Sequence, residues 1–158
     1  MRTGKIILIV SMGLFVGLAA MNNILMPQGG FGAVQGAVGM AITFQPPEAM
    51  WRAISSPALI WVLFSAIVIA ELIAAFFCFW GARRLWQARE SAEAFNAAKS
   101  TAIIGLSIIA GFYFFASHAI AQEWFLMWQS QQLNVLPDAF RNFAGAILIM
   151  LWLNTTDR

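Results

Sequence analysis

Residues 58–81, ALIWVLFSAIVIAELIAAFFCFWG, decide the fold, because Glu71 is the only charged side chain among them. A helix needs about 20 mostly apolar residues to cross a hydrocarbon core about 30 Å thick. This stretch therefore predicts a membrane-spanning helix, and residues 6–25 and 101–121 are also long enough to span. A fourth apolar run, 143–153, is shorter, and reaches spanning length only when it is extended back to Asp138.

The composition of the whole chain agrees with this interpretation. Of its 158 residues, 61 % are hydrophobic and 10 % are charged, whereas soluble domains are about 45–50 % apolar. The net charge of +2 comes from scattered basic residues, so no nucleic-acid-binding surface is expected. Cys78 is the only cysteine, which excludes an internal disulfide and a thiolate metal site. We expect an all-α membrane protein, a four-transmembrane-helix bundle in a single domain over residues 1–158.

The expected boundaries follow from the apolar runs and the breaks between them. We expect helices at about 5–26, 57–82, 100–128 and 138–154, with an outer loop at 27–56 and an inner loop at 83–99. If both termini are cytoplasmic, seven of the nine basic residues lie inside and two, Arg52 and Arg141, lie outside. The positive-inside rule favours this topology. An alternative for the first segment is a cleaved signal peptide, because MRTGK (1–5) is basic and GLAA (17–20) offers small residues.

The first outer loop combines glycine with many apolar side chains. Its glycines argue against a stable isolated helix, because glycine is a poor helix former. Its apolar groups, among them Phe31, Val38, Met40 and Phe44, are too numerous to be left in water. We expect this loop to lie on the bilayer surface or to pack over the bundle.

The second outer connection places tryptophans where the third helix leaves the bilayer. Trp124 and Trp128 are four residues apart, so a helix would present them on one face, as in an interfacial aromatic belt. A third tryptophan, Trp51, precedes the second helix on the same side. The candidate outer-face residues are Trp51, Arg52, His118, Gln122, Glu123, Trp124, Trp128 and Arg141. They predict a polar pocket or a partner interface, or alternatively membrane anchors with one Glu-to-Arg pair between the outer ends.

Glu71 is the candidate intramembrane polar site. An acidic side chain near the middle of a spanning helix costs about 2.5–3.5 kcal/mol, so it needs a partner. Tyr113, the only tyrosine, lies at a similar depth on the third helix and is the expected hydrogen-bond partner. Three roles stay open: a neutral acid that locks helix packing, a proton or cation site, or a contact with another protein, a lipid head group or a quinone.

No cofactor, metal site or enzyme activity is expected. The single histidine, His118, excludes bis-histidine haem ligation. Histidine–methionine haem ligation and Cu(I) binding by methionines remain formal alternatives, but the methionine spacing is not specific for either. The chain has no Ser-His-Asp set, zinc-ligand spacing, phosphate loop or carboxylate pair that would support catalysis.

Several motifs in order resemble a bacterial family of predicted small integral membrane proteins, a domain of unknown function. They are MWRAISSPAL (50–59), Glu71, GARRLWQAR (81–89), FNAAK (95–99), EWFLMWQSQ (123–131) and AFRNF (139–143). The resemblance covers nearly the whole chain. It implies four transmembrane helices in a bacterial inner membrane and no established reaction. The residues that carry over by position are Trp51, Arg52, Glu71, Glu123, Trp124, Trp128 and Arg141.

Two functional hypotheses follow. The first is a non-catalytic accessory subunit or assembly factor of a larger inner-membrane complex, which uses the outer tryptophan-rich face as its contact. The second is an oligomeric small transporter, channel or sensor in which Glu71 binds a proton or cation. Both place the chain in the lipid bilayer, the first with a larger membrane protein complex and the second as a homo-oligomer.

Overall fold

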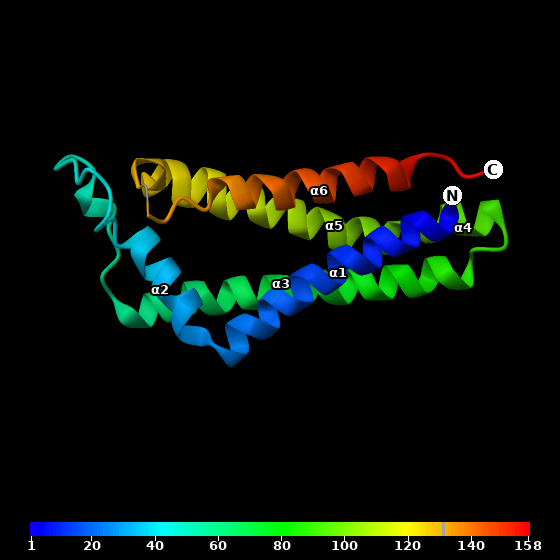
Figure 1. Cartoon of the computed structure of the whole chain (residues 1–158), viewed down its shortest axis with the longest axis horizontal. Coiled ribbons are helices and arrows are strands. Elements are labelled where there is room, and N and C mark those ends of the chain that lie inside the picture. Colours follow the sequence, from blue (N-terminus) through cyan, green and yellow to red (C-terminus); the bar gives the residue numbers. More distant parts are fainter. Residues whose placement is uncertain (131) are drawn as a thin grey trace.

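The computed structural model describes residues 1–130 and 132–158. Within these ranges all regular structure is helical, and four helical runs are long and apolar enough to cross a membrane (Figure 1). They are α1 (Arg2–Leu25), α3 (Pro57–Gln87), the run Ala92–Trp124, and α6 (Leu136–Asn154). The prediction of an all-α protein with four potential membrane spans is confirmed.

Small residues allow the spanning helices to approach closely. α3 packs against α1 and against α5 (Ser100–Phe112), and α5 packs against α6. A Cβ atom added at Gly105 would lie 2.8 Å from the backbone nitrogen of Cys78, and one at Gly81 would lie 2.5 Å from the Cα of Ala102. Close backbone approach at small residues is a common basis of helix association in membranes. The core is completed by fully buried side chains such as Ile9, Leu106 and Leu153.

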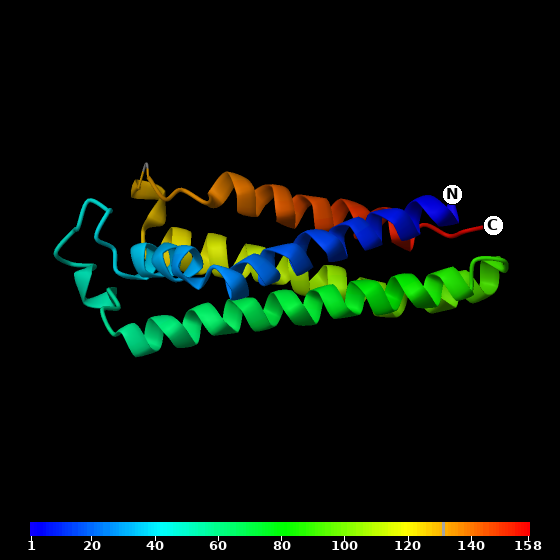
Figure 2. The ribbon, with the colours of Figure 1, turned by 60° about the horizontal axis from the view of Figure 1, so that its bottom comes forward.

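Both chain ends lie at the same end of the bundle, beside α4 (Ala92–Ala98) (Figures 1 and 2). We call this the terminal end and the opposite one the distal end. The shared position of the termini agrees with the expected topology, and the cytoplasmic orientation of that end stays a prediction. α3 continues to Gln87, beyond the expected boundary at residue 82, before the chain turns into α4.

The expected outer loop at 27–56 is helical in its first part, and this helix packs over the bundle rather than standing isolated. The helix is α2 (Pro27–Val38), which begins with proline in its first turn, where the missing N–H costs no hydrogen bond. A Cβ at Gly30 would lie 2.4 Å from the Phe64 ring, and one at Gly36 would lie 2.4 Å from the Leu133 side chain. Tight packing at these two glycines offsets their poor intrinsic helix propensity.

The third span departs from the single helix expected over residues 100–128. α5 is followed by η2, a π-helix over Tyr113–Trp124, and then by η3, a short 3₁₀ turn over Met127–Gln129. Leu126 has a left-handed backbone conformation, with φ of 55°, which ends the helical run. Trp124 and Trp128 therefore do not share one helical face as expected.

Candidate functional site

The interior polar site joins α3 to α1. Glu71 is buried, with 6 % of its surface exposed, and its Oε2 accepts a hydrogen bond from Asn23 Nδ2 at 3.1 Å. The expected partner, Tyr113, lies beside Glu71, but Asn23 provides the hydrogen bond instead. Asn23 could have been recognised from the sequence, because an asparagine in an apolar span is a frequent hydrogen-bonding link between membrane helices.

The interior polar site is tightly enclosed. Glu71 and Tyr113 line the same small gap, together with apolar side chains that include Val16 and Ile109. Among the described residues, this gap has no room for a water molecule. The hydrogen bond between Asn23 and Glu71 thus links α1 to α3, and Tyr113 on η2 lies against the same gap. Its evident physical effect is to fix how these helices pack.

Aromatic residues from distant segments meet at the distal end. We define the distal aromatic surface as Phe44, Trp51, Arg52, Trp124 and Trp128. The rings of Trp51 and Trp124 pack edge to face with centroids 5.7 Å apart, and the Arg52 guanidinium lies 4.8 Å from the centre of the Trp124 ring. Arg52 Nη1 also donates a hydrogen bond to the Trp124 carbonyl oxygen at 3.3 Å.

The other half of the distal aromatic surface is built in the same way. Phe44 and Trp128 pack edge to face at 6.3 Å, and the Phe44 backbone N–H donates to Gln129 Oε1 at 2.9 Å. Contacts between segments thus position these large side chains, although Trp51 remains 71 % exposed and Trp128 49 % exposed. The surface is ordered and accessible at the same time.

The polar residues expected beside the tryptophans are divided between separate places. His118, Gln122 and Glu123 line a shallow pocket of about 310 Å³, and the His118 ring stacks on Phe114 at 5.1 Å. Arg141 pairs with Asp138, three residues earlier in α6. The Glu-to-Arg pair that was one alternative for the outer ends does not form among residues 1–130 and 132–158: Arg141 binds Asp138, and Arg52 binds a backbone carbonyl.

A buried ionic cluster at the terminal end was not recognised from the sequence. Asp157 Oδ2 accepts from Lys5 Nζ at 2.6 Å and lies 2.8 Å from Lys99 Nζ. Asn96 holds the same segment, because its Nδ2 donates to the Asp157 carbonyl and its Oδ1 accepts from the Asp157 N–H. We call Lys5, Asn96, Lys99 and Asp157 the terminal latch. From the sequence, Lys5 and Lys99 indicate only topology, since their distance along the chain hides their proximity to Asp157.

Burial and charge act in opposite directions on Asp157. Burial alone would raise the pKa of its carboxyl group, but hydrogen bonds and positive charges from Lys5 and Lys99 lower it, and the net shift is below the ordinary value of 3.8. The carboxylate therefore stays charged at neutral pH and holds the C-terminal tail to α1 and to the loop after α4.

The candidate metal ligands of the chain do not come together in the structure described. In residues 1–130 and 132–158, no group of three or more His, Cys, Asp or Glu side chains is placed to share a metal ion. Haem or Cu(I) binding through His118 or methionine stays an untested alternative.

The four apolar spans and their buried polar links define a multi-pass integral membrane protein. The chain belongs to the family of predicted small integral membrane proteins DUF2165, whose model matches residues 1–156. The family resemblance inferred from the sequence motifs is thus confirmed. Comparison with curated proteins and with solved structures gives no match.

Proposed function

We propose that this protein is a non-catalytic accessory subunit or assembly factor of a larger complex in a bacterial inner membrane, and that the distal aromatic surface contacts its partner. The observation that carries the proposal is the ordered, exposed cluster of tryptophan and arginine side chains at the distal end. Residues of these types dominate the binding energy of many protein interfaces.

Preorganisation strengthens this proposal. Trp51, Arg52 and Trp124 hold one another in place, so a partner that binds them would lose little side-chain entropy. Membrane anchoring needs no such arrangement, because single interfacial tryptophans suffice for it. The same surface also fits a homo-oligomer, which is the other partner that the test below must distinguish.

The proton or cation hypothesis is the weaker one. Glu71 is hydrogen-bonded to Asn23 beside a gap that excludes water, whereas a conducting path needs a chain of waters or ionisable groups. A role in helix packing explains the buried carboxyl more simply. We therefore do not propose transport as a second function.

Co-purification tests the proposal. Tagged protein is isolated from its native membrane in mild detergent, and stoichiometric partners are identified by mass spectrometry. The test variant is Trp51→Ala with Trp128→Ala, which removes two exposed rings. The matched control is Trp86→Ala at the terminal end, where Trp86 is also 49 % exposed and lies 4.1 Å beneath the Arg89 guanidinium.

The proposal predicts a defined set of partners that is lost in the double variant and retained in the Trp86 variant. An effect of equal size in both variants would mean that general membrane anchoring was disturbed. A pure homo-oligomer in the wild type and in both variants would refute the accessory-subunit proposal.

A further inference from the structure

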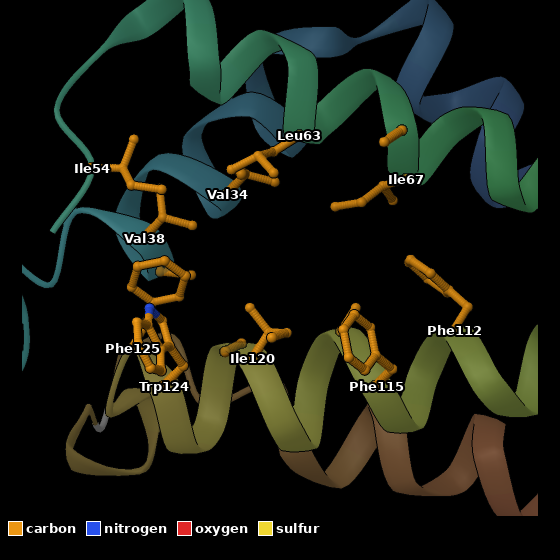
Figure 3. Close-up of a pocket in the computed structure, with 14 residues that line it drawn as sticks. Val34, Val38, Ile54, Leu63, Ile67, Phe112, Phe115, Ile120, Trp124 and Phe125 are labelled. Atoms are coloured by element: carbon orange, nitrogen blue, oxygen red, sulfur yellow. The ribbon is translucent and has the colours of Figure 1, made fainter. Parts of the chain in front are cut away.

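An apolar cavity lies within the distal half of the bundle, between α2, α3 and η2. Its volume is about 560 Å³, which is within the range of about 300–1,000 Å³ typical of small-molecule sites. Every residue that lines it has an aliphatic or aromatic side chain. Figure 3 shows the lining running from Phe112 to Trp124 and Phe125, with α3 on one side and η2 on the other. We call this the distal cavity.

The sequence explains why the helices separate here. At Gly105 the backbone of α5 nearly touches α3 at Cys78. Farther along the same run, bulky Phe112 and Phe115 face the space between the two helices (Figure 3). The run also changes to a π-helix at Tyr113, and π-helical segments occur frequently at functional sites. The third span is thus close-packed in its first half and open to a ligand in its second.

The surroundings of the distal cavity indicate what fills it. It is lined by apolar groups, in a protein whose solvent along the spans is hydrocarbon. A lipid chain gains contacts with both walls when it enters, and it exposes no polar group by doing so. The cavity also extends along α3 and η2 (Figure 3), which is the direction that an acyl chain takes in a bilayer.

Arg52 lies next to Trp124 at the distal end of this cavity, although it does not line the cavity itself. Trp124 lines the cavity, and Arg52 both lies over the Trp124 ring and donates to its carbonyl oxygen. The Arg52 Nε is buried and has no hydrogen-bond partner among residues 1–130 and 132–158. No carboxylate among residues 1–130 and 132–158 forms an ion pair with Arg52, so a phosphate would supply the missing counter-ion. A guanidinium binds phosphate through two parallel N–H donors, and a small movement of the side chain would let the phosphate reach Nε.

We infer that the distal cavity binds one acyl chain of an anionic phospholipid taken from the surrounding bilayer, with the lipid phosphate on Arg52. A neutral prenyl quinone would fill the cavity and its carbonyl oxygen would accept a hydrogen bond from Arg52, but it would leave the guanidinium charge without a counter-ion. Arg141, at the same end of the molecule, already pairs with Asp138. It therefore has less need of a phosphate and provides a matched control.

The head-group contact is tested by native mass spectrometry of protein equilibrated with equal amounts of phosphatidylglycerol and phosphatidylcholine that carry the same acyl chains. The wild type should retain one phosphatidylglycerol with a preference of about tenfold, as expected for hydrogen bonds to a charged group. Arg52→Gln should bring the two lipids to parity, and Arg141→Gln should keep the preference. Equal retention of both lipids by the wild type, or an equal loss in both variants, would overturn the inference.

The cavity is tested by filling it. Ala116→Trp, on η2, should abolish the retained lipid, and Ala66→Leu, on α3, should reduce it several-fold while changing the fold less. Size-exclusion chromatography and circular dichroism identify variants that remain folded, and Ala66→Leu decides the outcome if Ala116→Trp does not fold. Undiminished lipid in the folded variants would show that the lipid is annular and refute the cavity site. A quinone retained in place of the phospholipid would refute the head-group assignment.

Discussion

Asp157→Asn removes the only negative charge from the terminal latch and leaves the shape of the side chain nearly unchanged. The side chains of Lys5, Lys99 and Asp157 are 1 %, 7 % and 5 % exposed, so two ammonium groups would remain buried without a counter-ion. Removing one partner of a buried ion pair costs about 3–5 kcal/mol. The Thr155 carbonyl still accepts from both lysines, at 2.8 and 2.7 Å, which places the expected cost at about 3 kcal/mol.

Hydrogen exchange of the residue 157 amide measures this cost directly. The amide donates to Asn96 Oδ1 at 3.1 Å, so it exchanges when the latch opens. A cost of about 3 kcal/mol corresponds to opening that is more than about 100-fold more frequent, which is measurable by NMR in micelles. The matched control is Asp138→Asn, whose pair with Arg141 is 66 % and 75 % exposed; it should cost less than about 1 kcal/mol.

The reasoning is refuted if Asp157→Asn leaves the amide as protected as in the wild type. It is also refuted if Asp138→Asn changes exchange at residue 157 as much as the latch variant does, since the effect would then not come from the buried charge.

Three further predictions concern pH, the interior site and helix packing. Because the pKa of Asp157 is lowered, its stabilising contribution is present above the ordinary value of 3.8 and is lost as the pH falls further. Protection of the C-terminal tail amides from hydrogen exchange should therefore be constant from pH 7 to about 4 and then drop. A loss of protection already at pH 6 would contradict this. Glu71→Gln keeps an acceptor for Asn23 and should leave the thermal midpoint of unfolding nearly unchanged, whereas Glu71→Leu should lower the stability of the protein by about 1 kcal/mol. Equal destabilisation by both variants would show that the charge itself is needed. Gly105→Ala should destabilise the bundle by about 1–3 kcal/mol, because the added Cβ would meet Cys78 at 2.8 Å. The control Gly111→Ala adds a Cβ that meets nothing within 4 Å, so it should be neutral or stabilising in the same thermal assay. Equal effects of the two variants would refute the close approach of α5 to α3.

The spanning helices could be predicted from the sequence because their signal is local. Twenty apolar residues in a row have few other structures open to them in a membrane. The helix at 27–38 could not be predicted in this way, because its stability depends on Phe64 and Leu133, which are distant in sequence and fit against its glycines. The π-helix at 113–124 has no distinct sequence signal of its own, since its residues are ordinary for an apolar span.

The candidate sites were predicted in part. Their residue types indicated that Glu71 needs a partner and that tryptophans gather at the distal end, because both inferences depend on cost and amphipathic character. The pairings depend on tertiary contacts instead. Asn23 contacts Glu71 across 48 positions of sequence, and Asp157 contacts Lys5 across 152. Hydropathy marks Asn23 as a polar residue in an apolar span, but neither hydropathy nor helical spacing identifies which residue it or Asp157 contacts.

Photo-crosslinking in intact native membranes tests the proposed partner interface most directly. A photoreactive amino acid replaces Trp51 on the distal aromatic surface or, as control, Trp86 at the terminal end; both side chains are large and exposed. The account predicts a discrete adduct with one other membrane protein from position 51 and none of the same mass from position 86. Adducts only with lipid or with a second copy of this chain would contradict the role as an accessory subunit.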